Sequence, residues 1–320
     1  MNFRALRTFV TTAQTGGLGR AARQLNVSQP AASRQIHTLE EELGVRLFRR
    51  VGRRLQLTLE GDDLLRQSHR LLADVDSLVE RARALKGGRT GTLKVAATAQ
   101  FITGLLAPFL SGYQRRHPGI DVELIEGSSA LHRVRLEYGE VHLAIMPATG
   151  RRFAHKILAP VHVMAVIHKS HGLSRRTTLE VSELLSERLL LMHREFHSRA
   201  WFEAACEISD VQPQILLQST TASTLVELAA VNYGIAVVPS TTIVRGAALH
   251  AIPLVQSGKS IGQWSMVCWN ERRPTPFYAK SFVEELVIHS KRAFPGQKLL
   301  RHAPALQKPF SAQYPVPLEA

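Results

Sequence analysis

The side chains best suited to chemistry in this chain lie between positions 28 and 37. They carry hydroxyl, amide, guanidinium and imidazole groups, which can hydrogen-bond to base edges or to phosphate oxygens. The set, with a proline of the first helical turn, is Ser28, Gln29, Pro30, Ser33, Arg34 and His37. Among them, Pro30, Arg34 and His37 share one exposed face of a helix, with Ser33 beside them. We therefore predict that this face contacts a nucleic acid, with Gln29, Ser33 and Arg34 reading bases.

An apolar stripe on the opposite face is what positions these side chains. Ala32, Ile36, Leu39 and Leu43 follow one another at spacings of four, three and four residues, which is typical of a buried helix face. Ser28 is suited to cap the helix, and Pro30 to its first turn. The acidic residues 40–42 crowd the other end and would repel phosphate, so only the N-terminal half is expected to enter a DNA groove. A solvated amphipathic helix without a partner is the alternative, and the flanking segments decide between them.

Two shorter helices precede this one. Apolar residues repeat at i, i+3, i+4 and i+7 in both; they are Leu6, Phe9, Val10 and Ala13, and then Leu18, Ala21, Ala22 and Leu25. Gly16 and Gly17 separate the two helices, and Asn26-Val27 forms the turn into the third. Three helices joined by tight turns predict a helix-turn-helix.

Four arginines follow the third helix around Val51-Gly52: Arg49, Arg50, Arg53 and Arg54. The alternation of Leu55, Leu57 and Leu59 with polar residues predicts a hairpin, so these arginines would form a wing that contacts phosphate. A basic surface loop with no partner is the alternative. Residues 1–58 hold ten arginines and three glutamates, so the positive charge concentrates here, as expected for nucleic-acid binding.

The composition is that of a globular protein with an anionic partner. The chain has 320 residues, a formal net charge of +14, a sequence pI of about 10.4 and 45% hydrophobic residues. It contains no apolar run long enough to span a membrane, and its start lacks the apolar core of a signal peptide. Its two cysteines, Cys206 and Cys268, are too few for a disulfide scaffold. We expect a cytoplasmic protein without a membrane partner.

A long helix is predicted after Thr58, which would cap it. Leucines recur every seven residues in one row, and Leu65, Leu72 and Val79 form a second row. A seven-residue repeat of this length predicts a coiled-coil seam between two copies of the chain. The predicted dimerisation residues are Leu64, Leu71, Val75, Leu78 and Leu85. The alternative is that the helix packs on its own domain.

Beyond a glycine-rich linker at 86–91, strands and helices alternate, which predicts parallel sheets covered by helices. The predicted strands are 93–97, 120–125, 141–146, 161–167, 188–192, 215–218, 235–238 and 266–269. The predicted helices are 102–113, 129–138, one near Leu184, 200–208, 223–232 and one around 282–287. Residues 295–320, rich in proline and without periodicity, are expected to be a disordered tail.

Residues 1–60 resemble the winged helix-turn-helix of LysR-type transcriptional regulators. The segments that carry this resemblance are RALRTFVTTAQTGG, RAARQLNVSQPAASRQIHTLEEELGVRLFRR and LTLEG. The chain departs from the family at Gly17-Leu18-Gly19, where hydroxyl residues are usual. We therefore expect the second helix to lack a side-chain cap, at a cost on the order of 0.5–1 kcal/mol.

The second part resembles the two-lobed, periplasmic-binding-protein-like effector domain of the same regulators, through QRRHPGIDVELIEGSS, LEYGEVHLAI and LVELAAVNYGIAVVP. It departs from the family at His142 and at Asn232-Tyr233. The predicted fold is thus a mainly helical winged domain over 1–59, a linker helix over 60–90 and an α/β effector domain over 91–294. By resemblance, lobe I comprises 91–160 and 265–294, and lobe II comprises 161–264. The resemblance implies promoter DNA, a small effector, a homodimer or dimer of dimers, and possible contact with the transcription machinery.

Ligands of such lobes bind beyond the C-terminal ends of the strands, against helix N-termini. The segments that meet this description are rich in hydroxyl groups and poor in charge, which favours a small anionic molecule. The candidate effector residues are Thr98, Gln100, Phe101, Ser128, Ser129, His197, Ser198, Thr221, Ser223 and Thr224. The alternative is that Ser128 and Ser223 merely cap their helices.

We expect no metal, cofactor or catalytic residue. His193 and His197 are four residues apart, but the segment begins in a strand-to-helix turn, where that spacing has no fixed meaning. The cysteines have apolar neighbours, which favours inert buried thiols over a redox switch.

Two other functions remain as alternatives. The first is an enzyme on the two-lobed fold, although the sequence shows no nucleophile elbow, phosphate loop or paired carboxylates, and recovery of an unchanged ligand would argue against it. The second is a non-specific architectural DNA binder, which would not respond to small molecules. The sequence favours an effector-responsive regulator.

Overall fold

The computed structural model describes residues 2–51, 54–85, 90–148, 153–273, 275–298 and 301–307. The chain divides into two compact units, of which the first is Met1–Gly88 with Glu137–Glu140 and the second is Arg89–Leu136 with Val141–Ala320. No helix within the described ranges has the length and apolar character that a membrane span requires.

The first unit begins with three helices, as the apolar periodicity predicts: α1 (Phe3–Thr15), α2 (Leu18–Gln24) and α3 (Gln29–Leu43). Helices α1 and α3 end at Gly16 and Gly44, both of which adopt the left-handed conformation that favours glycine. Ser28 caps α3, because its hydroxyl oxygen accepts a hydrogen bond from the Ala31 amide. The predicted helix-turn-helix is confirmed.

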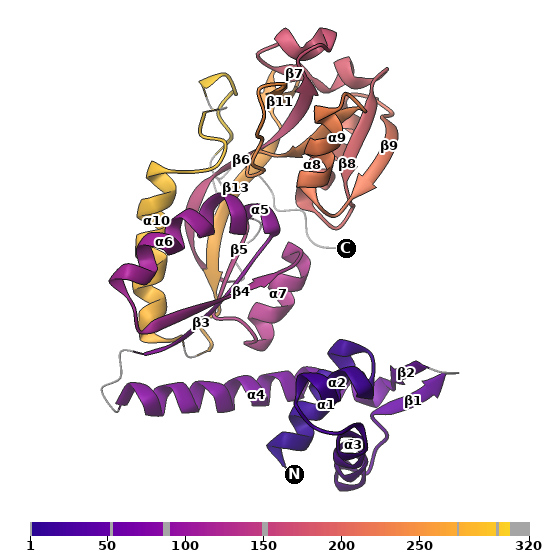
Figure 1. Ribbon diagram of the computed structural model, residues 1–320, viewed down its shortest axis with the longest axis vertical. Coiled ribbons are helices and arrows are strands. Elements are labelled where there is room, and N and C mark those ends of the chain that lie inside the picture. Colours follow the sequence, from indigo (N-terminus) through magenta and orange to yellow (C-terminus); the bar gives the residue numbers. More distant parts are fainter. Residues whose placement is uncertain are drawn as a thin grey trace. The chain divides into compact units, whose positions relative to one another are not determined.

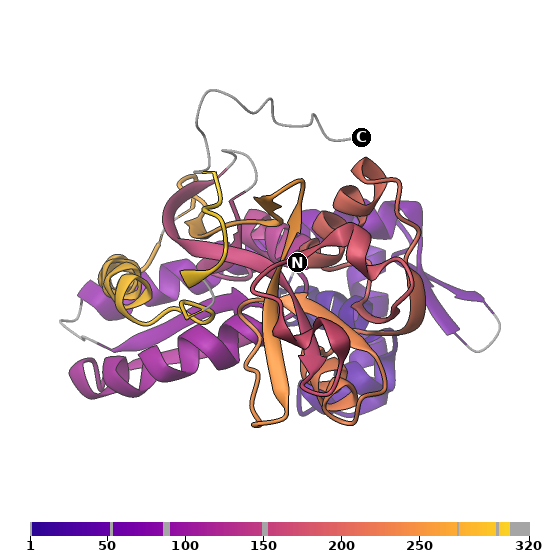
Figure 2. The ribbon, with the colours of Figure 1, turned by 90° about the horizontal axis from the view of Figure 1, so that it is seen from above.

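The wing is an antiparallel hairpin of β1 (Phe48–Val51) and β2 (Arg54–Leu57), which projects from the helices (Figures 1 and 2). Helix α4 (Leu59–Leu85) follows, and the Thr58 hydroxyl caps it by accepting a hydrogen bond from Gly61 N at 2.9 Å. Its first turns belong to the core of the unit, because Leu64, Leu65 and Leu72 pack against residues of α1 and α3. The N-terminal half of α4 therefore packs on its own domain, which was the alternative to a coiled-coil seam.

The second unit has two lobes built on mixed sheets. The lobe I sheet has the order β4-β3-β5-β13-β6, and the lobe II sheet continues as β6-β10-β8-β9, with β11 also paired to β6. The lobe I strands are β3 (Gly91–Ala97), β4 (Ile120–Glu126), β5 (Leu143–Pro147), β6 (Ala154–His168) and β13 (Gly262–Trp269). The strands of lobe II are β7 (Leu179–Glu180), β8 (Arg188–Met192), β9 (Gln214–Ser219), β10 (Ile235–Pro239), β11 (Leu249–Gln256) and β12 (Lys259–Ser260).

Helices cover both faces of each sheet. In lobe I, α6 (Ala107–Arg116) and α10 (Phe277–Arg292) share one core, and α7 (Ser129–Tyr138) packs on the other face (Figure 1). In lobe II, α8 (His197–Ile208) and α9 (Ala222–Ala230) pack in two separate cores. Short elements complete the chain: α5 (Ala99–Phe101), a π-helix at Ile102–Leu106, and 3₁₀ turns at Gly172–Arg175 and Val181–Leu184.

Two strands cross from one lobe to the other. The first part of β6 pairs with β13, and its second part pairs with β10 and β11, so a single strand belongs to both sheets. Strand β13 returns beside it, and a side chain at Gly262 would bring a Cβ within 2.1 Å of the Val161 carbonyl oxygen. Glycine is therefore required where the two crossover strands approach each other.

The structure differs from the sequence prediction at several elements of this unit. Strand β6 begins seven residues before the apolar run at 161–167, because its first residues, AHKILAP, mix polar and apolar side chains and end in a proline. The sequence does not predict strands β7, β11 and β12, because β7 and β12 are only two residues long and Pro253 interrupts the apolar run of β11. The expected disordered tail is wrong for residues 301–307, which hydrogen-bond to the crossover region, while residues 308–320 lie outside the described ranges.

Candidate nucleic-acid interface and effector site

The polar residues predicted to contact DNA are exposed together on α3. Ser28, Gln29, Pro30, Ser33, Arg34 and His37 all belong to the exposed class, while Ala32, Ile36 and Leu39 on the opposite face are buried. An exposed face with an amide, a hydroxyl and a guanidinium near the N-terminal end of a helix has the chemistry for reading base edges in a major groove.

The wing adds positive charge to this surface. Arg49 and Arg50 on β1 are exposed. Arg53 lies outside the described residues, and for Arg54 only the backbone position in β2 is described. Guanidinium groups on a hairpin are suited to phosphate contacts, which position a protein on DNA.

Glu40 has a different role from the one its sequence suggests. The sequence places it with Glu41 and Glu42 in the acidic end of the helix that would repel phosphate, but its side chain is only 8% exposed. Its Oε1 accepts hydrogen bonds from the backbone N–H groups of Leu47 at 2.8 Å and Phe48 at 3.2 Å, and its Oε2 accepts one from Arg46 Nη1 at 2.9 Å. A buried carboxylate thus ties the start of the wing to the recognition helix α3.

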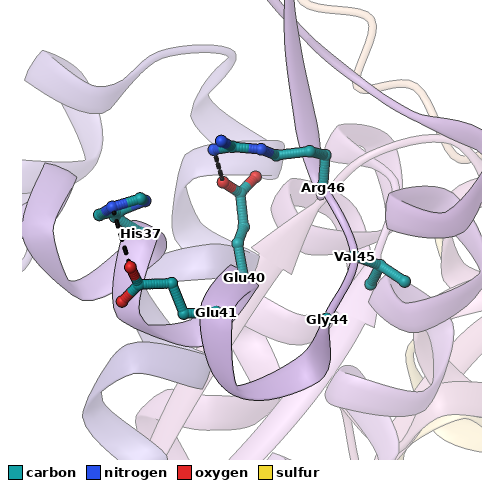
Figure 3. Close-up of a pocket in the computed structure, with 6 residues that line it drawn as sticks. All are labelled: His37, Glu40, Glu41, Gly44, Val45 and Arg46. Atoms are coloured by element: carbon teal, nitrogen blue, oxygen red, sulfur yellow. Dashed lines mark hydrogen bonds and ion pairs between the residues drawn. The ribbon is translucent and has the colours of Figure 1, made fainter.

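A surface pocket of about 260 Å³ lies at the C-terminal end of α3. Figure 3 shows the residues that line it. Arg46 points toward Glu40, while His37 and Glu41 pair beside them at 3.3 Å. The carboxylate of Glu41 therefore faces a neighbouring imidazole at the helix surface.

Gly17 and Gly19 stand where the family usually has hydroxyl residues. The first affects the capping of α2, and the second affects the space around Gln29. Gly17 is the N-cap of α2 and makes no side-chain capping bond, as expected. A Cβ at Gly19 would approach Gln29 Oε1 to 3.3 Å, a tight contact. The absence of a side chain at Gly19 thus leaves room for Gln29, one of the residues predicted to read bases.

Helix α4 also presents large apolar side chains that the winged domain does not cover. Leu71, Leu78 and Val79 are 43%, 69% and 44% exposed. Of the other predicted seam residues, Leu64 packs in the core, Val75 is half-buried, and the side chain of Leu85 lies outside the described residues. Large apolar side chains in a row on a solvent-facing helix are typical of a surface that a second chain covers.

A cavity lies between the two lobes of the second unit. Six of the predicted effector residues line it: Thr98, Gln100, Phe101, Ser129, His197 and Ser198. The cavity has a volume of about 40 Å³, room for one or two water molecules, whereas typical ligand pockets measure roughly 300 Å³ or more. A ligand therefore requires the lobes or the lining side chains to move.

Four predicted effector residues are outside this lining. Ser128 is buried directly before α7, and Thr221, Ser223 and Thr224 are exposed at the start of α9. We expected the N-terminus of α9 to face the ligand, but the helix that reaches the cavity from lobe II is α8. Ser223 is also not a cap, since α9 begins at Ala222.

Sequence reasoning missed eight lining residues, several of them aromatic: Pro147, Val161, Phe196, Trp201, Pro239, Thr241, Trp264 and Ser265. Trp201 lies on α8 four residues after His197, so the helical spacing could have indicated it. The residues on β5, β6, β10 and β13 carry no such local signal, because strand pairing alone brings them together.

Two helix N-termini from opposite lobes meet at this cavity. Ser129 is the first residue of α7 in lobe I, and His197 and Ser198 are the first residues of α8 in lobe II. The N-terminal end of a helix carries partial positive charge, which attracts anions. The lining has hydroxyl, amide and imidazole groups, and no carboxylate lies among the described residues that form it.

The electrostatics of the cavity also favour an anion. Burial lowers the pKa of His197, and the nearby Arg133 guanidinium lowers it further, so the imidazole is neutral near pH 7. An anion beside this imidazole would reverse that effect, because negative charge favours the protonated form.

The cysteines do not have the environment of reactive thiols. Both are buried, and burial raises the pKa of Cys206 to about 11 and that of Cys268 to about 12. Because the thiolate is the reactive form, both thiols are inert at neutral pH. His193 pairs with Glu195 at 3.6 Å, while His197 lies in the cavity lining.

The two units correspond to two known domains. Residues 3–62 match the bacterial regulatory helix-turn-helix protein, lysR family, and residues 86–290 match the LysR substrate binding domain. The chain belongs to the LysR family. It is a LysR-type DNA-binding transcriptional regulator with an effector-binding domain, as its resemblance predicts.

Known LysR-type regulators resemble it over most of its length. It is 28% identical to HTH-type transcriptional regulator AlsR of Bacillus subtilis (strain 168), over 75% of this chain and 81% of that protein. It is 30% identical to HTH-type transcriptional regulator TfdS of Cupriavidus pinatubonensis (strain JMP 134 / LMG 1197), over 75% of this chain and 83% of that protein. The crystal structure of full-length CbnR complexed with its target DNA superposes with a TM-score of 0.64 and 23% identity, over 92% of this chain and 100% of that one.

Proposed function

We propose that this regulator reads its promoter through the exposed half of α3 and the β1–β2 wing, and that a small organic anion between the lobes modulates its action. The observation that carries the second part is the cavity, because both lobes line it next to the crossover strands. Binding there stabilises one angle between the lobes over others, and a ligand shifts this equilibrium by its difference in affinity for the two forms.

The cavity chemistry favours a small carboxylic acid with an apolar body. The hydroxyls of Thr98, Ser129 and Ser198 and the two helix N-termini suit the carboxylate. The indole rings of Trp201 and Trp264 provide an apolar wall for the remainder. Polar groups on one part of the lining and indole rings on another therefore favour a carboxylic acid as the ligand over a sugar or a cation.

We further propose that two copies pair through the exposed stripe of α4, so that two recognition helices engage two half-sites of an operator. The exposed Leu71, Leu78 and Val79 support this proposal. CbnR was crystallised with its target DNA; by analogy, we place the action of this chain at promoter DNA in the cytoplasm.

The test is a thermal unfolding screen of the full chain against small carboxylic acids. An acid at 100 times its dissociation constant should add about 2.7 kcal/mol to the free energy of unfolding. Replacing Thr98 with valine removes a cavity hydroxyl at similar size, so Thr98→Val should lose most of this gain. The matched control is Thr224→Val, which removes an exposed hydroxyl outside the cavity and should keep it.

Two results would contradict the proposal. If Thr98→Val and Thr224→Val both keep the full gain, the acid binds elsewhere. If the acid is chemically changed after incubation with the protein, the chain is an enzyme rather than a sensor. An effect of the acid on operator binding, measured by gel shift, completes the test.

A further inference from the structure

The chain after α10 returns across the junction of the two lobes. Phe294 is buried in the lobe I core. A Cβ at Gly104 of lobe I would come within 2.8 Å of both Pro295 Cγ and the Thr241 carbonyl oxygen of lobe II, so Pro295 lies where the lobes touch. Gly296 has φ +80°, and a Cβ there would be 2.6 Å from the Ser240 carbonyl oxygen. Residues 294–296 therefore pack closely against both lobe I and lobe II.

Residues 301–307 then lie along the crossover strands. The Ser260 hydroxyl donates a hydrogen bond to the Pro304 carbonyl at 2.7 Å, and Trp264 Nε1 donates to the Leu306 carbonyl at 3.4 Å. The Pro304 carbonyl also faces His162 on β6, where burial lowers the pKa of the imidazole and this carbonyl raises it. The segment thus contacts β6, β12 and β13 within a few residues.

Trp264 connects this segment to the cavity. Its side chain lines the cavity, and its indole N–H bonds to Leu306. Thr241 also lines the cavity, and its carbonyl lies next to Pro295 at Gly104. A ligand that displaces either residue disturbs the C-terminal segment, and a change in the segment displaces the cavity wall.

We propose that residues 295–298 and 301–307 form a strap that fixes the angle between the lobes, and that an effector acts against the strap by moving Trp264. This inference rests on the proposed function, because it assigns a regulatory element to the same cavity. Two crossover strands alone form a hinge about which the lobes can rotate. The strap adds a third connection, which holds both strands and contacts both lobes.

The strap is suited to opening at low cost. Residues 301, 302, 305 and 307 are exposed, and the bond from Trp264 is long. Segments with few buried apolar contacts open more readily than the core around them. An effector of modest affinity is therefore sufficient to displace it.

The test compares two truncated chains. One ends at Lys298 and lacks the residues that bond to Ser260 and Trp264; the control ends at Gln307 and keeps them. Spin labels at Ala107→Cys on α6 and Glu227→Cys on α9 report the distance between the lobes, because both positions are exposed and outside the cavity lining. The native thiols are buried with raised pKa values, so they do not take up the label.

We expect the chain ending at Gln307 to match the full chain, and the chain ending at Lys298 to give an inter-lobe distance distribution about twofold wider. In the full chain, Ser260→Ala combined with Trp264→Phe should widen the distribution by an intermediate amount. This variant keeps the proposal testable if the shorter chain does not fold. Equal widths in all folded variants would overturn the strap.

The distance measurement needs neither an effector nor DNA, so it is independent of the proposed function. A separate measurement examines regulation, with the carboxylic acid that stabilises the full chain as the probe. Loss of the strap should tighten its apparent binding about three- to tenfold, because the binding-competent lobe angle becomes more populated. A widened distribution with unchanged acid affinity would overturn the regulatory role.

Discussion

At the scale of single residues, the role of a side chain depends on what surrounds it. Arg34 and Glu40 are six positions apart on the same helix, yet the first is exposed and the second is buried beneath the wing. His132 on α7 is fully buried, whereas His37 pairs with Glu41 at the surface. Residue type alone therefore does not distinguish a contact residue from a structural one.

Arg34→Ala should relax sequence recognition. A guanidinium that reads a base edge contributes about 1–3 kcal/mol of discrimination, so this variant should weaken cognate binding more than random binding. Arg49→Ala is the control, because a phosphate contact on the wing weakens both DNAs alike and flattens the salt dependence. Titrations of cognate and random duplexes by fluorescence anisotropy measure both effects. Equal losses on the two DNAs for Arg34→Ala would show that it does not read bases.

Stability should fall in acid because of His132. Burial, and then Arg135, lower the pKa of its imidazole to about 4, while the carbonyls of Ala97 and Gly127 act in the opposite direction. The folded pKa is below the unfolded value of about 6.5, so the unfolded state binds the proton first, and stability is lost as pH falls from about 6.5 to about 4. The shift corresponds to a loss on the order of 3 kcal/mol.

Urea unfolding at several pH values compares the wild type with His132→Gln. The variant cannot titrate at this position, so its free energy of unfolding should fall less between pH 6.5 and 4. Its residual slope includes His162, His197 and His289, whose pKa values are also lowered by burial. It also includes Glu285, whose pKa burial raises but hydrogen bonds from Arg116 and His117 lower more strongly. Parallel curves for the two proteins would contradict the role of His132.

At the scale of elements, the wing and the recognition helix are positioned by one carboxylate. Glu40 accepts hydrogen bonds from two backbone amides at the entry to β1 and from Arg46. The angle between α3 and the β1–β2 hairpin therefore depends on a side chain that is buried away from the face of α3 predicted to contact DNA.

Glu40→Gln should weaken DNA binding without loss of the fold. An amide keeps the size of the carboxylate and one oxygen that can accept the two backbone hydrogen bonds. It loses the negative charge, and its NH₂ group faces Arg46, so two donors face each other. We expect the free energy of unfolding to fall by about 1–3 kcal/mol. Glu41→Gln is the control, since it removes only an exposed pair with His37. Thermal unfolding and DNA titration of both variants test this difference. A Glu40→Gln protein that binds DNA normally would show that the wing is held by other contacts.

At the scale of the whole molecule, the number of chains that associate determines how many half-sites of an operator the protein can bind. The core of the first unit does not cover Leu71 and Leu78 of α4. Their burial in a dimer would place two winged domains on one operator, which a single domain cannot span.

Leu78→Glu should give a monomer that no longer binds an operator with two half-sites. A carboxylate at this position would be buried without a partner in the seam, which strongly disfavours association. Glu60→Gln, on an exposed residue in the first turn of α4, is the control. Sedimentation equilibrium and gel shift measure the two effects. A dimeric Leu78→Glu protein with normal operator binding would rule out the seam.

The local elements were predictable from the sequence because their causes are local. Ser28 and Thr58 cap the helices that follow them, and Gly16 and Gly44 end helices because a left-handed residue is required there. The apolar spacing placed α3 correctly, since the periodicity of a helix is independent of its tertiary neighbours. The exposed face of α3, with Arg34 on it, follows from the same spacing.

Only the tertiary structure decided which residues share the cavity and which are buried. Pro147 and Trp264 lie on strands β5 and β13, and Thr241 lies in the turn after β10; their meeting depends on strand pairing that no local pattern encodes. Glu40 is buried because the chain folds back over it at Leu47, seven residues later. Residues 301–307 are held by backbone carbonyls, which every sequence supplies, so their composition alone could not distinguish an ordered strap from a disordered tail.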